Sequence, residues 1–463
     1  MEEMNRTQER ITLATVMCSA FLVPFIASAL NLALPAVGQE FQSSAVLLSW
    51  IVTSYLVASA AFLLPFGRWA DMRGRHAIFQ AGLGFFALFT LLCALSPSIH
   101  ILLGFRLMQG IAAAMIFSTS TAILTEVFPP HRRGRVLGLS IASTYLGLSL
   151  GPVLGGWMNH YLGWRSIFYF IAALSLVVTV FATLYMKGEW KEAAGESFDL
   201  NGSLLYITSL LIFMYGISTL ADNHNARYFA MAGAFLLAGF VVYELRQDQP
   251  LIEMRLFVEN ISFAFSNLAA MINYSATFAL GFLMSIYLQT ILGMGSQQAG
   301  MIMLAQPIMM AVFSPLAGNL SDRVEPRAVA STGMGITALG LLGFVFLGFN
   351  TPVAAIVANL ALIGFGFALF TSPNTNAVMA SVKPRLYGVA SSALGTMRMV
   401  GQAFSMAIVT LILAAYVGDV LLDQVDRGLL LLTMRTAFTI FTALCALGIF
   451  ASIARGKAST EEV

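Results

Sequence analysis

Charged residues are scarce in this chain of 463 residues: Asp, Glu, Lys and Arg make up 10% of it, whereas 58% is hydrophobic. A typical globular domain carries about 25% charged residues. So few charges cannot cover the surface of a water-soluble protein of this length, and the mean hydropathy of +0.82 points the same way. The composition therefore excludes a soluble multi-domain protein, a disordered chain and a collagen-like chain.

Cysteine is nearly absent as well. The three cysteines, Cys18, Cys93 and Cys445, lie inside apolar runs, and their odd number and isolation exclude a disulfide framework and a thiolate metal site. The apolar runs also lack a His–carboxylate pair, a Gly-x-Ser-x-Gly motif and a phosphate-binding loop. We therefore expect neither an enzyme nor a bound metal or cofactor.

Long apolar runs are what the sequence has in abundance. A helix needs about 20 apolar residues to cross a bilayer, and these runs are continuous, whereas the strands of a membrane β-barrel alternate apolar and polar residues. The chain is predicted to be an all-α polytopic membrane protein with fourteen spans, and the first run is expected to be a retained helix and not a signal peptide. The spans are expected near residues 11–37, 45–66, 77–96, 99–125, 136–160, 165–186, 200–220, 227–245, 261–290, 297–317, 328–349, 352–380, 387–416 and 433–454.

The basic residues predict the orientation of the spans. An even number of spans puts both termini on one side, and placing that side in the cytoplasm puts most of the 24 Lys and Arg there. This bias is the positive-inside rule. Four basic residues lie on the outer side of the membrane: Arg165, Arg227, Arg427 and Arg435. Two more, Arg106 and Arg398, lie within spans.

Two landmarks occur twice in the chain. The turn from Gly67 to Arg75 resembles the turn from Gly318 to Arg327, and a Pro-x3-Gly segment at Pro130 returns at Pro384. Both offsets are about 250 residues, which predicts a duplicated unit of six helices with two further helices inserted between the copies. The expected divisions are residues 1–188, 189–259 and 260–463.

Several short motifs follow one another in a recognisable order. They are the turn Gly67–Arg75, Arg106 with Gln109-Gly110, the run Gly147-x3-Gly151-Pro152 with Gly155-Gly156, Trp164–Phe168, Phe198-Asp199-x2-Gly202, and Glu244-x-Arg246-x3-Pro250. Together they resemble the major facilitator superfamily, and within it the fourteen-helix drug:proton antiporter family. The resemblance covers essentially the whole chain. It implies two six-helix bundles plus two inserted helices, and export of hydrophobic or amphiphilic compounds by alternating access and proton antiport.

The resemblance also assigns roles to residues. It implies a latch between the two halves on the cytoplasmic side, built from Gly67, Asp71, Arg73, Gly74 and Arg75, with Asp322 in the second copy. Gly74 permits a sharp turn, and Asp71 can pair with Arg73, Arg75 or the start of a partner helix. The alternative is an ordinary positive-inside turn with a solvated aspartate.

The fifth span carries the motif associated with antiporters, formed by Gly147, Gly151, Pro152, Gly155 and Gly156. Glycines at a spacing of four have no side chains on that face and so let another helix approach closely, and a proline kinks the helix. We expect an adjustable contact with the tenth span. Packing without a gating role is the alternative.

The acidic residue expected for proton coupling is missing from the first span, where Ile26 occupies the position of the family's aspartate. Glu126, at the end of the fourth span, is the remaining coupling candidate by position, and a cap at the membrane interface is its alternative role. Arg106 lies within the fourth span, where a charge is expensive. It is predicted to modulate the proton site or meet substrate, unless it extends to the outer interface.

A cavity with two arginines and no carboxylate favours neutral or anionic amphiphiles over cations. Aromatic, methionine and amide side chains suit such ligands. The predicted lining comprises Phe21, Phe25, Asn31, Tyr55, Met115, Tyr145, Asn273, Tyr274, Gln289, Gln306, Asn374 and Arg398.

The expected partners are a hydrophobic or amphiphilic small molecule, protons and membrane lipid, with no nucleic acid, and the chain is expected to act as a monomer. Its expected place is the inner (cytoplasmic) membrane of a prokaryote. Two other functions stay open: a lipid or fatty-acid exporter, which the missing acids would suit, and a non-transporting membrane protein on the same scaffold.

Overall fold

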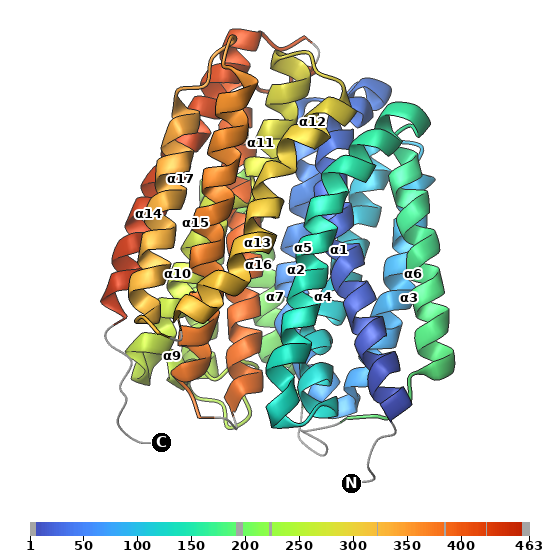
Figure 1. Cartoon of the computed structure of the whole chain (residues 1–463), viewed down its shortest axis with the longest axis vertical. Helices are drawn as coiled ribbons and strands as arrows, with labels where there is room; N and C mark the ends of the chain where they lie inside the picture. Colours follow the sequence, from blue (N-terminus) through green and yellow to red (C-terminus); the bar gives the residue numbers. More distant parts are fainter. Residues whose placement is uncertain are drawn as a thin grey trace.

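The chain folds into a bundle of membrane-length helices, with both termini at the same end of the molecule (Figure 1). The computed structural model describes residues 6–190, 198–221, 225–321, 323–383, 386–422 and 424–455. Among these residues, 14 stretches of helix are long and apolar enough to cross a membrane, which confirms the predicted all-α polytopic fold. We call the end that carries both termini the terminal side and the opposite end the far side.

The first six spans form a group that we call the first bundle. Its helices are α1 (Arg6–Phe41), α2 (Ala45–Arg73), α3 (Arg75–Ala94), α4 (Ile99–Val127), α5 (Pro130–Leu162) and α6 (Arg165–Tyr185). α1 packs along α5, α2 along α4, and α3 against both α4 and α6.

Two helices follow that belong to neither bundle by sequence. They are α7 (Leu200–Ser218) and α8 (Ala226–Glu244), which pack against each other. α7 also packs on α2 of the first bundle and on α16 of the second. The Tyr206 hydroxyl on α7 donates a hydrogen bond to the Ala60 carbonyl on α2 at 3.1 Å.

The remaining six spans form the second bundle, entered through the short helix α9 (Met254–Glu259). Two of these spans are interrupted. Their helices are α10 (Ile261–Thr277), α11 (Leu280–Ile286) and the π-helical η1 (Tyr287–Ile291), then α12 (Ser296–Met303) with α13 (Ala305–Ser321), α14 (Pro326–Val345), α15 (Val353–Ala380), α16 (Tyr387–Tyr416) and α17 (Arg427–Ala454).

Packing in the second bundle repeats that in the first. α10 packs along α16, α13 along α15, and α14 against both α15 and α17, each equivalent to a pair in the first bundle. Short polar side chains start helices in both bundles and in the inserted pair: Ser44, Ser98, Asp199, Asn260 and Asp426 each accept a hydrogen bond from the backbone N–H three residues later. Such caps satisfy backbone donors that a helix end leaves unpaired.

The two bundles are joined near the far side. Among the described residues, the hydrogen bonds between the bundles all lie in the far-side half of their helices. They link Ser49 and Thr53 with Thr410, Ser285 with Asn31, Gln289 with Leu32, and Ser296 with Gly156. The backbone adds a bridge between Ser44 and Leu421 beyond them. The far side is therefore closed in this structure.

Candidate functional site

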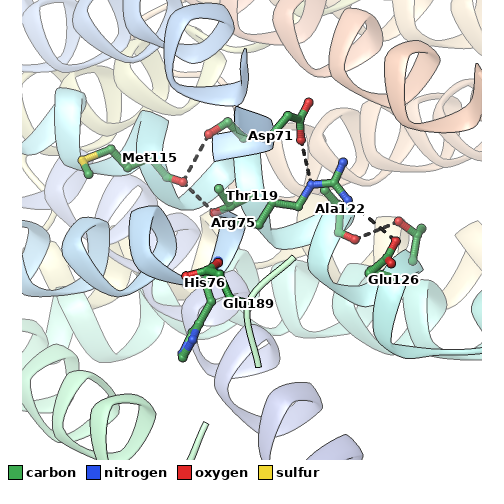
Figure 2. Close-up of polar contacts among 10 residues, drawn as sticks. Asp71, Arg75, His76, Met115, Thr119, Ala122, Glu126 and Glu189 are labelled. Carbon is green, nitrogen blue, oxygen red and sulfur yellow. Dashed lines mark hydrogen bonds and ion pairs between the residues drawn. The ribbon is translucent and has the colours of Figure 1, made fainter. Parts of the chain in front are cut away.

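A charged network surrounds the turn between α2 and α3 on the terminal side. Gly74 takes a φ of +129° there, a conformation that favours glycine, so the predicted sharp turn is present. Nε of Arg75 donates to the Asp71 carboxylate at 2.7 Å, and its Nη1 lies 4.0 Å from the Glu126 carboxylate. Figure 2 shows Arg75 between these two acids. The arginine is 4% exposed, so the predicted partner of Asp71 is a buried guanidinium.

The segment after α6 closes over this turn. The backbone N–H of Arg75 donates to the Trp190 carbonyl at 3.0 Å. That of His76 donates to the Glu189 carboxylate at 3.0 Å, and Figure 2 shows these two residues side by side. A side chain at position 74 would collide with Glu189. The turn is thus also held by the segment that follows α6, which the sequence motif does not reveal.

The other predicted latch residues lie around this network. Gly67 approaches Ser118 of α4, and Arg73 is exposed at the end of α2. Asp322 lies outside the described residues. Whether these groups hold the bundles together in another state stays a prediction.

Glu126 stands at the last turn of α4 and its side chain is 36% exposed. Its described ion-pair partner is Arg75, which it shares with Asp71. The coupling candidate is therefore part of the predicted latch, a connection that sequence position alone does not give.

The α5 glycines make two close contacts with different helices. A side-chain carbon added at Gly155 would lie 2.5 Å from Cβ of Ala29, and one at Gly151 would overlap Ser28, both on α1. Gly147 likewise touches the α1 backbone at Phe21. These three glycines therefore let α1 and α5 of one bundle pack backbone to backbone.

The predicted contact with the tenth span is made by the other two residues of the motif. A side-chain carbon at Gly156 would lie 2.5 Å from the Ser296 carbonyl on α12, and the Ser296 hydroxyl donates to the Gly156 carbonyl at 3.0 Å. One turn away, Gly300 of α12 packs against the Pro152 carbonyl. This contact joins the two bundles on the far side.

Arg106 is 1% exposed and lies inside the first bundle. Its Nε donates to the Ile51 carbonyl at 3.0 Å, another nitrogen donates to the Gln109 amide oxygen, and Gln109 donates to Thr90 at 2.5 Å. The guanidinium lies 4.3 Å from the Tyr55 ring centroid. The side chain does not reach the outer interface; it ties α2, α3 and α4 together.

Arg398 on α16 has different surroundings. It is half-buried, donates to the Thr375 hydroxyl on α15 at 2.6 Å, and lies 5.7 Å from the Tyr274 ring centroid on α10. Tyr145 of the first bundle lies in a small buried cluster with Met310 and Phe367, and Tyr274 packs against that cluster. The structure therefore brings three predicted lining residues, Tyr145, Tyr274 and Arg398, to one place between the bundles.

Other predicted lining residues pack within the first bundle. Phe21 and Phe25 have ring centroids 5.5 Å apart, and Phe25 is fully buried. Tyr55 lies beneath Arg106, and Met115 belongs to a small buried cluster of α2, α3 and α4. Substrate contact by these residues stays a prediction.

A third group lies in or near the second bundle. The Asn31 carbonyl accepts from Ser285, whose hydroxyl also accepts from Gln289 at 2.9 Å, so two predicted lining residues belong to the far-side closure. Asn273 is fully buried on α10, and within the described structure neither its amide oxygen nor its nitrogen has a hydrogen-bond partner. Gln306 is half-buried on α13.

Asn374 lies near the terminal side of the second bundle. Its amide oxygen accepts from Arg455 at 2.9 Å and its nitrogen donates to the Ser266 carbonyl at 3.1 Å. Burial, with Arg327 nearby, lowers the pKa of Arg455 to about 10, so the guanidinium stays charged at neutral pH. In the sequence Arg455 looks like one more positive-inside charge, and only the fold shows that it is buried against Asn374.

Comparison with known proteins agrees with this arrangement. A sequence profile described as Major Facilitator Superfamily matches residues 16–243 and 267–462. The chain belongs to this superfamily. It is therefore a secondary transporter of the major facilitator type and not an enzyme.

Individual relatives of this superfamily cover most of the chain. "Multidrug resistance protein Stp" of Mycobacterium tuberculosis (strain ATCC 25618 / H37Rv) is 30% identical over 433 residues, which cover 92% of this chain and 79% of that protein. "Riboflavin transporter RibZ" of Clostridioides difficile (strain 630) is 25% identical over 401 residues, 86% of this chain and 87% of that protein. The predicted resemblance to multidrug exporters is confirmed.

Among solved structures, a bacterial homologue of the human lysosomal transporter Spinster, in an inward-facing and unoccupied conformation, has a TM-score of 0.72 at 14% identity. The match covers 98% of both chains. At this identity it shows the fold alone, which is the major facilitator fold predicted from the motifs.

Proposed function

We propose that this major facilitator exports hydrophobic or amphiphilic compounds by alternating access, in exchange for protons. The observation that carries this is the position of the bonds between the bundles. They lie on the far side, whereas Arg398 and its aromatic neighbours lie between the bundles nearer the terminal side. Breaking the far-side bonds and joining the bundles on the terminal side would open the same place to the opposite face.

The direction of transport rests on the relatives and on orientation. Stp is named a multidrug resistance protein, and a transporter gives drug resistance when it moves the compound out of the cell. The positive-inside bias supports a cytoplasmic terminal side, and bacterial relatives support the cytoplasmic membrane. In the structure at hand the far side is closed, so the proposed substrate would enter from the cytoplasm.

Proton coupling is proposed for the network of Asp71, Arg75 and Glu126. Two carboxylates share one buried guanidinium, so protonating one changes how strongly the arginine holds the other. Because the same network borders the α2–α3 turn, that change would reach the predicted latch. Glu126, the more exposed acid beside Arg75, is the proposed proton-accepting group.

The test is transport of N-phenyl-1-naphthylamine, a neutral fluorescent amphiphile, in proteoliposomes with and without an imposed pH gradient. Wild-type protein is expected to move the probe faster with the gradient, and Glu126→Gln is expected to remove the dependence on pH. Arg106→Ala tests the prediction that Arg106 modulates the proton site or meets the substrate. Glu253→Gln is the matched control, because Glu253 lies on the terminal side away from this network.

Three outcomes matter. Transport that never responds to pH would contradict antiport. If Glu126→Gln still shows gradient-driven transport, the coupling site lies elsewhere in the protein, and the proposed export still holds. No transport of this probe, of a fatty acid or of ethidium would favour a non-transporting protein on this scaffold.

A further inference from the structure

Arg398 is a charged group at depth in the membrane without an opposite charge. It lies on the fourth turn of α16, and in the part of the chain that the structure describes no carboxylate forms an ion pair with it. Its one described hydrogen bond goes to the hydroxyl of Thr375, and its buried Nε has no hydrogen-bond partner. A charged group inside a membrane protein is costly, and a missing partner therefore points to a ligand.

Two other buried arginines have more hydrogen-bond partners than Arg398. Arg106 is fully surrounded by Ile51, Gln109 and the Tyr55 ring. Arg455 also has a buried Nε without a hydrogen-bond partner, but its Nη1 donates to Asn374 at 2.9 Å and its Nη2 donates to the Pro326 carbonyl at 3.2 Å. Arg398, with one described hydrogen bond, is thus the least satisfied of these three arginines.

The surroundings of Arg398 are apolar and aromatic. Tyr145, Met310 and Phe367 form a small buried cluster against which Tyr274 packs, and the rings of Tyr274 and Phe367 meet edge to face with centroids 5.2 Å apart. Tyr145 belongs to the first bundle, whereas the others belong to the second. A ligand held here would contact both bundles, as an alternating-access substrate must.

We propose that Arg398 binds the anionic group of the substrate, so that the transported class is amphiphilic organic anions with a carboxylate or sulfonate and an aromatic or aliphatic body. The anion would accept hydrogen bonds from the guanidinium nitrogens that Thr375 does not use, and the apolar body would lie against the cluster of Tyr145, Tyr274 and Phe367. Cations are repelled at the same point. The inference rests on the proposed export function for its physiological meaning.

Thr375 has a positioning role in this site. Its hydroxyl, 2.6 Å from Nη2, holds the guanidinium in one orientation. Preorganised donors bind an anion more tightly than mobile ones.

The test uses two fluorescent probes that differ by one group, N-phenyl-1-naphthylamine and its sulfonated analogue 8-anilino-1-naphthalenesulfonate. Binding of each is measured by equilibrium dialysis against full-length protein in lipid nanodiscs, with empty nanodiscs subtracted. Arg398→Gln is expected to weaken binding of the sulfonate about tenfold or more, the loss typical of one charge-assisted hydrogen bond, and to leave the neutral probe within about twofold. Arg398→Lys, which keeps the charge, should recover part of the loss.

Two further variants separate the site from general effects. Arg427→Gln removes the same charge from an exposed far-side position and should change neither probe. Thr375→Val should weaken the sulfonate by less than Arg398→Gln does and leave the neutral probe unchanged. A merely structural role would weaken both probes together and would lower the thermal unfolding midpoint.

The proposal is wrong if wild type and Arg398→Gln bind the sulfonate equally, or if the variant loses both probes equally. The binding result stands apart from the proposed export. Transport of the neutral probe or ethidium without selective sulfonate binding would sustain export and overturn the anion site. Selective sulfonate binding by a protein that transports nothing would sustain the anion site and overturn the proposed export.

Discussion

The hydroxyl oxygens of Ser49 and Thr410 lie 2.9 Å apart, one on α2 of the first bundle and one on α16 of the second. Both groups are buried on the far side, and Thr53 approaches the same Thr410 hydroxyl at 3.4 Å. If alternating access opens the far side, this pair must separate in every transport cycle.

A covalent link between these positions should therefore stop transport. The double variant Ser49→Cys, Thr410→Cys, in a background without the three native cysteines, is expected to lose transport on oxidation and to regain it on reduction. Each single cysteine variant should show no such response. Full transport by the oxidised double variant, with the crosslink verified by mass spectrometry, would mean that the far side does not open here.

The close packing of α1 on α5 predicts an effect of a single methyl group. Gly155→Ala places Cβ 2.5 Å from the Ala29 side chain and 2.8 Å from its Cα, so the helices must separate. Such overpacking costs about 1–3 kcal/mol. The thermal unfolding midpoint should fall in a fluorescence assay of the purified protein.

Gly138 on the same helix provides the control, because a methyl group there meets no atom within 4 Å. Both substitutions gain the better helix propensity of alanine, about 1 kcal/mol in a helix interior. Gly138→Ala should therefore be neutral or slightly stabilising. Equal midpoints for the two variants would contradict the packing argument.

Arg106 is expected to be a stability residue. Arg106→Met removes the bond to the Ile51 carbonyl and leaves the buried Gln109 amide oxygen without its donor, and an unsatisfied buried group costs about 1–3 kcal/mol. The variant should unfold at a lower temperature than wild type. Arg398→Gln, which removes a guanidinium with a single described hydrogen bond, should unfold close to wild type.

Asp71 and Arg75 should be coupled energetically. Since the arginine is 4% exposed, Asp71→Asn leaves a buried charge with a weaker partner, Glu126 at 4.0 Å. We expect Asp71→Asn to lower the unfolding midpoint in wild type but to have much less effect in an Arg75→Gln background. The non-additive part is expected to be about 0.5–3 kcal/mol. Additive effects would contradict a direct pair, and exposed Arg73→Gln should change little.

The fold followed from the sequence to a large extent because hydropathy and charge placement are local properties. Apolar length predicted the number of spans, and the α2 span of 45–66 is extended in the structure to Arg73 by polar residues that continue the helix. The interruptions were not predicted. Residues 261–290 read as one apolar run, whereas the structure breaks them at Phe278 and shifts to π-helical bonding at Tyr287. Hydropathy measures how apolar a segment is and carries no information about its hydrogen-bond register.

The candidate site was predicted less completely. Arg106 and Arg398 look alike in the sequence, each a lone charge in a span, but only the fold supplies the Ile51 carbonyl that satisfies the first. Thr375 and Phe367, which surround the second, are ordinary residues of an apolar helix until α15 packs beside α16 and α10. Gln109 is the exception, because its spacing of three from Arg106 places both on one face of α4.

The inserted helices make the two flanks of the transporter different. α7 lies against both α2 and α16, across the line where the bundles meet, and Tyr206 fastens it to α2. On the opposite flank the bundles pack through α5 with α12 and α13, and in the described ranges neither inserted helix packs extensively on these three helices. A compound dissolved in the lipid therefore finds one flank shielded and one not, and sideways entry from the bilayer would be confined to a single direction.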